Sequence, residues 1–273
     1  MKKDFLELKK YYREAAAKLP DDSVFMDDIN HKFKHSVEVL HIGRTILKQT
    51  PELSDRTVEF SNFAEKALLF HDVGRFTEST LRYTAQNSAD KEAPAPIYDH
   101  SLIGFELLKQ NPLYNDIRIL LAVRFHGSLM RDVKNSPLWQ QAEDSPHFQN
   151  AEKILYLVRD ADKLSILHST VSENRLMKDP FYRQLTPEAL NAPLSENVLQ
   201  QFMNQQNIVS STVYSFADRL LYVLSWIFDF NYQKTRQIFR QKAYARYLLD
   251  LLTQYHKNES DIKTIEQLAK QYL

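Results

Sequence analysis

The scarcity of glycine constrains this chain more than any other feature of its sequence. Only four glycines occur among 273 residues, whereas glycine makes up about 7% of an average protein. Sheet-rich folds place glycine in their turns, and nucleotide sites use it to let the backbone approach phosphates. The sequence contains neither a G-x-G-x-x-G nor a GK[ST] motif. We therefore predict an all-α protein.

Hydrophobic periodicity indicates helices along most of the chain. The spacing predicts helices over residues 4–19, 33–49, 54–71, 99–108, 115–126 and 151–168, and three or four more after residue 195. Asp99 is the expected N-cap of its helix. Thr77–Pro96 is predicted to be a long loop, because Asn87–Asp90 and two prolines oppose a helix there. We expect a helical domain over residues 1–194 and a C-terminal helical extension over 195–273 packed on it.

Charge and composition argue against several kinds of partner. The chain has 35 basic and 35 acidic residues, whereas nucleic-acid and membrane-surface proteins need a basic excess. We therefore expect no nucleic-acid partner and no membrane. Without cysteine the chain has no disulfide, thiolate zinc site or cysteine nucleophile. The first ten residues are charged, and no apolar run reaches about 18 residues, so we expect a cytoplasmic protein.

Two histidines stand on apolar helix faces. His35 shares its face with Val39 and Ile46, and His71 continues the apolar stripe of the next predicted helix. Such a histidine alone is more often a core residue than a metal ligand, but His71 is followed directly by Asp72. A buried carboxylate is costly unless it is paired or binds a metal. At a helix end, where the nearby glycine lets the chain turn, both side chains can face one point.

A further acidic ligand is expected from the helix over residues 151–168. At about 100° per residue, Asp162 lies roughly 80° from the centre of the apolar arc of that helix, whereas Asp160 lies roughly 120° away, on the solvent flank. Asp162 is therefore the better candidate ligand. Asp160 is left as either a supporting residue or part of the solvated face.

The ordered set His35, His71-Asp72 and Asp162 resembles the HD-domain metal-dependent phosphohydrolase superfamily, whose signature is H…HD…D. The resemblance covers about residues 31–170. It implies an all-α HD-domain helical bundle in which these two histidines and two aspartates hold one divalent cation. Mixed nitrogen and oxygen ligands suit Mn, Fe, Co, Ni or Zn better than Ca. Asp72 is expected also to orient or deprotonate the water that attacks the phosphoester.

The resemblance leaves open whether one or two metals are bound. His100 and His126 are expected to line the phosphate pocket of a one-metal site. In the alternative, both ligate a second metal that Asp72 bridges to the first. Arg75 and Lys163 lie within three residues of a ligand and are expected to clamp phosphate, although a surface ion pair fits them equally well.

Several features remain without a firm role. Arg75 and Asp160 also make the chain similar to an uncharacterised bacterial branch of the superfamily, for which no substrate is implied. The predicted loop Thr77–Pro96 is a candidate lid over the site. The remaining histidines are interpreted as structural or surface residues: His31, His41, His147, His168 and His256.

The leading hypothesis is a phosphohydrolase that acts on a nucleotide or another small phosphorylated molecule. One alternative is an HD-fold di-iron oxygenase, which needs six protein ligands. The other is a non-catalytic HD module that binds a nucleotide. A homodimer is one candidate for the oligomeric state.

The positions of the glycines also point to the site. Gly43, Gly74, Gly104 and Gly127 each follow one of the candidate histidines within eight residues. Close helix packing or close approach of a ligand explains such a placement.

Overall fold

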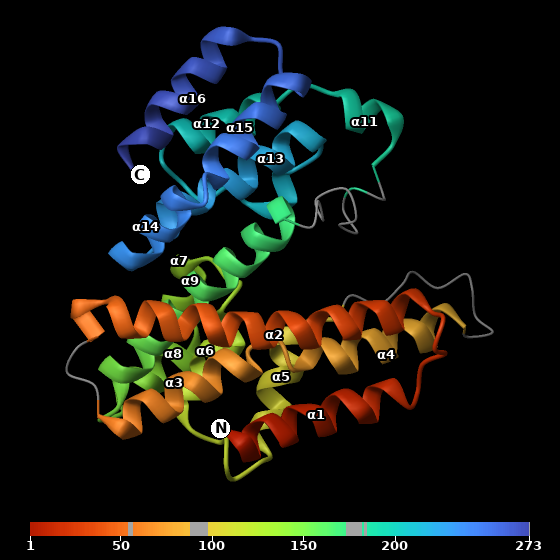
Figure 1. Ribbon diagram of the computed structural model, residues 1–273, viewed down its shortest axis with the longest axis vertical. Coiled ribbons are helices and arrows are strands. Elements are labelled where there is room, and N and C mark those ends of the chain that lie inside the picture. Colours follow the sequence, from red (N-terminus) through yellow and green to blue (C-terminus); the bar gives the residue numbers. More distant parts are fainter. Residues whose placement is uncertain (54–56, 88–97, 173–181, 183–184, 273) are drawn as a thin grey trace. The chain divides into compact units, whose positions relative to one another are not determined.

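Figure 1 shows the computed structural model, which describes residues 1–53, 57–87, 98–172, 182 and 185–272. These residues form helices, turns and connections and no strand, which confirms the all-α prediction. Contacts within the chain define two compact units, Met1–Asp162 and Lys163–Leu273. The domain division expected after residue 194 stays a prediction.

The first unit is a bundle in which α2 packs against α1, α3 and α4, and α6 packs against α3 and α5. Its elements are α1 (Lys2–Ala16), α2 (Val24–Gln49), the 3₁₀ helix η1 (Pro51–Leu53), α3 (Val58–Phe70), α4 (Gly74–Gln86), α5 (His100–Lys109), α6 (Ile117–Phe125), α7 (Met130–Lys134), α8 (Pro137–Glu143) and the first part of α9 (Phe148–Ser172).

The long helix α2 begins nine residues earlier than its periodicity predicted. The Ser23 hydroxyl accepts the Met26 N–H at 3.1 Å and so caps the helix. Phe25 and Ile29, in the first two turns, are buried. Lys32, which the prediction left outside the helix, therefore lies on α2 less than one turn before His35.

The helix α4 corrects the expectation of a loop over Thr77–Pro96. Residues 77–86 belong to α4, whereas the remainder of the proposed lid, from residue 88 onward, lies outside the described part. Packing explains the difference, because Phe76 is buried against Tyr12 at 6.0 Å between ring centroids and Tyr83 contacts Phe25 at 5.8 Å. These tertiary contacts outweigh the weak helix propensity of the threonines in this segment. Asp99 caps α5 as predicted.

Helix packing accounts for most of the glycines. A Cβ atom on Gly74 would lie 2.0 Å from the His100 carbonyl oxygen and 2.6 Å from the Gly104 nitrogen, so only glycine lets α4 and α5 approach so closely. Gly43 and Gly104 are also tightly packed, whereas Gly127 has no such neighbour within 4 Å. No glycine has positive φ. Gly74 therefore serves close packing and not the turning of the chain that we expected of it.

In the second unit α13 packs against α11, α12 and α15, and α15 also packs against α14 and α16. Its elements after α9 are α11 (Pro187–Asn191), α12 (Glu196–Met203), the 3₁₀ helix η3 (Ser210–Thr212), α13 (Phe216–Leu224), the 3₁₀ helix η4 (Ser225–Asp229), α14 (Gln233–Gln241), α15 (Tyr244–Tyr255) and α16 (Glu259–Gln271). Among the described helices of the chain, none is long and apolar enough to span a bilayer.

Candidate metal centre

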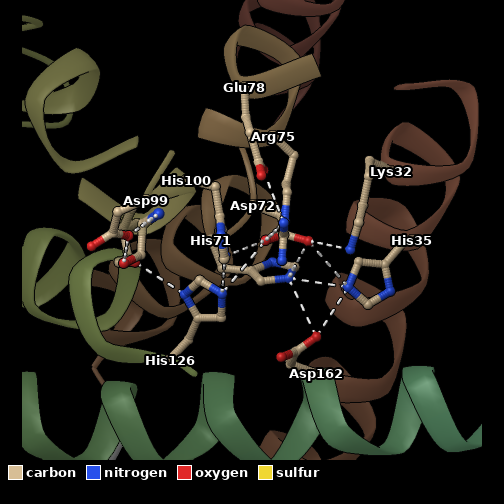
Figure 2. A network of polar contacts seen from close by, with 12 residues as sticks. Lys32, His35, His71, Asp72, Arg75, Glu78, Asp99, His100, His126 and Asp162 are labelled. Atoms are coloured by element: carbon tan, nitrogen blue, oxygen red, sulfur yellow. Dashed lines mark hydrogen bonds and ion pairs between the residues drawn. The ribbon is translucent and has the colours of Figure 1, made fainter. Parts of the chain in front are cut away.

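Four predicted ligands are brought together by three separate parts of the first unit (Figure 2). His35 lies on α2 and Asp162 on α9. His71 and Asp72 lie in the tight turn between α3 and α4, where the Val73 N–H donates to the Phe70 carbonyl at 3.0 Å. Because this turn is too short to separate the two helices, it presents both side chains to the same cluster.

Each of the two aspartates offers an oxygen close to the Nε2 atoms of both His35 and His71. His35 Nε2 lies 3.0 Å from Asp162 Oδ1 and 3.3 Å from His71 Nε2. Asp72 Oδ2 lies 3.7 Å from the His35 nitrogen and 3.8 Å from the His71 nitrogen. A cation at about 2.0–2.3 Å from each ligand separates neighbouring ligand atoms by about 2.8–3.8 Å. His35, His71 and Asp72 are therefore close enough together to hold one cation, and Asp162 lies beside both histidines.

A second group of ligands shares Asp72. His100 is the first residue of α5 and His126 is the C-cap of α6. Their Nε2 atoms lie 3.4 and 3.5 Å from Asp72 Oδ1 and 3.4 Å from one another. Asp72 therefore turns one oxygen to each group (Figure 2). The histidines that we expected to line a phosphate pocket occupy positions suited to a second metal.

Backbone hydrogen bonds orient two of the four imidazole rings. His71 Nδ1 lies 2.9 Å from the Leu68 carbonyl oxygen, and His126 Nδ1 lies 3.0 Å from the Val123 carbonyl oxygen. A carbonyl only accepts, so Nδ1 carries the proton in both rings and Nε2 is left as the ligand atom. In both cases the acceptor lies three residues earlier, in the preceding helix, so the geometry of the helix end fixes the orientation of the ring.

The electrostatics of the site favour ionised carboxylates. Burial raises the pKa of Asp72, but Lys32, His71, a hydrogen bond from His126 and Arg75 outweigh it, and the pKa lies well below its ordinary value. Burial likewise raises the pKa of Asp162, and hydrogen bonds from the histidines bring it well below the ordinary value. Both residues are therefore charged ligands at neutral pH.

The histidines of the site differ in their affinity for a proton. Burial and the nearby Lys32 lower the pKa of His35. Burial also lowers the pKa of His71, but Asp72 and Asp162 overcome this and raise it above its ordinary value. Burial lowers the pKa of His100 to about 3. Of these three rings His71 holds a proton most readily, and metal binding has to displace that proton.

Two cations also contact Asp72. Arg75 Nε lies 3.7 Å from Asp72 Oδ1, and its guanidinium also donates to Glu78 at 2.8 Å. Lys32 Nζ lies 2.9 Å from Asp72 Oδ2. Lys32 was missed by the sequence analysis because the helix was expected to begin one residue after it. Its position three residues before His35 was the available signal, because residues three apart lie on the same helix face.

Lys163 and Asp160, the other two candidates on α9, lie outside the ligand groups found among the described residues. Lys163 Nζ donates to Asp229 Oδ2 at 2.6 Å within the second unit, and its phosphate-binding role stays a prediction. Asp160 is fully buried, so its placement on a solvent flank was wrong. The preceding Val158 and Arg159 and the following Ala161 are also buried. A helical wheel assumes an exposed face, which this stretch of α9 lacks.

A buried arginine supports the turn that carries His126. The Arg159 guanidinium on α9 donates to the carbonyl oxygens of Phe125 at 3.0 Å, His126 at 3.2 Å and Ser128 at 2.5 Å. The carbonyls at the end of a helix lack partners within it, so Arg159 satisfies those at the end of α6. Arg159 was not predicted from the sequence as a residue of the site.

The remaining histidines lie outside the ligand groups identified among the described residues. His31 stacks on His35 at 6.2 Å between ring centroids. His256 contacts Asp261 at 2.8 Å, and His168 lies 3.4 Å from the Tyr244 hydroxyl.

Comparison with known protein families finds a match that covers the candidate metal centre. Residues 33–167 match the family model described as HD domain. Comparisons with curated proteins and with solved structures gave no match. The matched segment begins in α2 and ends in α9, and it contains all six ligand residues.

Proposed function

The chain belongs to the HD-domain superfamily, and we propose that it is a metal-dependent phosphohydrolase that cleaves a phosphoester of a nucleotide or another small phosphorylated molecule. HD domains bind divalent metals, and the six-residue cluster offers the ligands. The uncharacterised bacterial branch suggested by its sequence stays a prediction.

The observation that carries the proposal is the position of Asp72 between two groups of ligands. Its Oδ2 faces His35 and His71, and its Oδ1 faces His100 and His126. Carboxylates that bridge two metals are typical of sites that hold the attacking and leaving oxygens of a phosphoester. We therefore favour two divalent transition metals (Mn, Fe, Co, Ni or Zn) over the single metal that we first expected.

The residues of the site have different roles in the proposed hydrolysis. When bound, the metals lower the pKa of a coordinated water and screen the charge of the phosphate. Asp72 offers one oxygen to each ligand group and orients the attacking water. His100, whose side chain is 21% exposed, lies at the accessible side of the second group. Arg75 lies beside Asp72 and supplies a planar fork of donors to the phosphate oxygens.

A di-iron oxygenase is a second candidate, because six protein ligands are what that activity needs and the same six residues supply them. The two cationic side chains beside Asp72 favour a phosphorylated substrate in either case. Metal analysis and oxygen uptake separate the candidates, since only the oxygenase consumes O₂.

The proposal predicts a definite loss of metal from each ligand variant. Wild-type protein is expected to carry two transition-metal ions per chain, His126→Ala one, and Asp72→Ala none, because Asp72 belongs to both groups. Elemental analysis of the purified proteins and a panel of phosphoesters measure metal content and hydrolysis. We expect hydrolysis to fall at least about 100-fold in Asp72→Ala.

The control is His41→Ala, because His41 is exposed on α2 outside the ligand groups. It is expected to keep both metals and full activity. A wild-type protein that carries no transition metal and hydrolyses no phosphoester would contradict the proposal.

A further inference from the structure

Two cationic side chains approach Asp72 from its two edges (Figure 2). The Lys32 ammonium lies 2.9 Å from Oδ2, and Arg75 Nε lies 3.7 Å from Oδ1. Because each oxygen faces a different ligand group, Lys32 lies beside the group of His35 and Arg75 beside the group of His100.

The cations are the accessible part of this cluster. The side chains of Lys32 and Arg75 are 24% and 32% exposed, whereas that of Asp72 is only 4% exposed. A solute that approaches from water therefore meets these two side chains before it reaches the carboxylate. Long side chains of this kind can move their heads while their stems stay packed.

The Asp72 carboxylate that attracts Lys32 is also a candidate metal ligand. Asp72 Oδ2 belongs to the ligand group of His35 and His71. Once this carboxylate shares its charge with a divalent cation, it attracts the ammonium less. The three N–H donors of Lys32 then become available to an anion beside the site.

We propose that Lys32 binds a phosphate group of the substrate, across Asp72 from Arg75. This inference rests on the proposed phosphohydrolase function. It places at Lys32 the role that the sequence suggested for Lys163, whose ammonium contacts Asp229 at 2.6 Å. Lys32 supplies a compact point charge and Arg75 a rigid fork, so together they hold different oxygens of one phosphate.

The test measures binding of inorganic phosphate to metal-loaded protein by titration calorimetry. Lys32→Met and Lys32→Gln remove the charge and shorten the side chain by only one atom, and we expect either to weaken phosphate binding about tenfold or more. Lys32→Arg keeps the charge and is expected to stay within about threefold of wild type. The control is Lys34→Met, which removes an exposed charge from the same helix and is expected to change nothing.

Metal titration without phosphate gives an independent readout. If Lys32 leaves Asp72 when metal binds, Lys32→Met is expected to bind two metals at least as tightly as wild type. Unchanged phosphate affinity in both neutral variants would overturn the inference, as would loss of the metals from them. Wild-type protein that holds metals and phosphate through Lys32 but hydrolyses no ester would support this inference while it contradicts the proposed function.

Discussion

Asp72 and His100 show how burial and neighbouring charges set the pKa of each side chain within a crowded site. Asp72 stays ionised although it is buried, because Lys32, His71 and Arg75 surround it with positive charge. His100 lies 3.4 Å from the same carboxylate, yet burial dominates and lowers its pKa to about 3. A neutral imidazole at this position is what a metal ligand requires.

The low pKa of His100 predicts a pH dependence of stability for the metal-free protein. Between pH 6.5 and about 3 the unfolded chain binds a proton at His100 and the native chain does not. The free energy of unfolding therefore falls as the pH falls, by about 1.4 kcal/mol per pH unit. Urea unfolding in the presence of a chelator at several pH values measures this slope.

The matched variant is His100→Gln, which cannot titrate. We expect it to lose stability less steeply than wild type below pH 6.5. Parallel curves for the two proteins would show that burial does not depress the pKa of His100.

At the scale of helices, the site depends on how closely α4 and α5 approach one another. Gly74 opens α4 directly after the His71-Asp72 turn, and His100 opens α5. Where these two helix starts meet, a Cβ on Gly74 would lie 2.0 Å from the His100 carbonyl oxygen. The contact that brings both ligand groups together therefore has no room for a methyl group.

A pair of glycine variants tests this packing. Gly74→Ala is expected to destabilise the protein by about 1–3 kcal/mol or more, because backbone atoms must move to admit the methyl group. Gly127→Ala meets no such atom within 4 Å and has no positive φ, so it is expected to stay within about 1 kcal/mol of wild type. Denaturant unfolding compares the two, and equal stabilities would contradict the packing argument.

At the scale of the whole molecule, the ligands are distributed unevenly between the two compact units. All six ligand residues lie in Met1–Asp162 and none of them in Lys163–Leu273. The two tryptophans of the chain divide between the units, with Trp139 in the first and Trp226 in the second. Each is buried and therefore reports the unfolding of its own unit.

Metal is expected to stabilise the first unit more than the second. At 100 times its dissociation constant, a metal adds about 2.7 kcal/mol per site to the native state that binds it. Thermal unfolding followed by fluorescence in Trp226→Phe, which keeps Trp139, should show a rise in Tm with metal. Trp139→Phe, which keeps Trp226, should show a smaller rise. Asp72→Ala introduced into each protein should abolish both, and a shift that survives it would place the metal elsewhere.

Much of this protein could be predicted from local patterns. Glycine scarcity and helical periodicity predicted the all-α class, and the spacing of His35, His71, Asp72 and Asp162 predicted four residues that the structure brings together. The helical prediction succeeds because periodicity depends on the residues of one segment, and the ligand prediction succeeds because each ligand stands at a recognisable place in its own segment, such as an apolar face or a helix end.

The sequence by itself determined the helical class and the types of ligand, because composition and periodicity act within single segments. Only the tertiary structure decided that His100 and His126 lie beside Oδ1 of Asp72 and that Lys32 contacts Oδ2. It also decided that Asp160 is buried. Each of these depends on which helices pack together and how closely. Periodicity places a side chain on a face of its own helix, but the neighbours across that face come from distant parts of the chain.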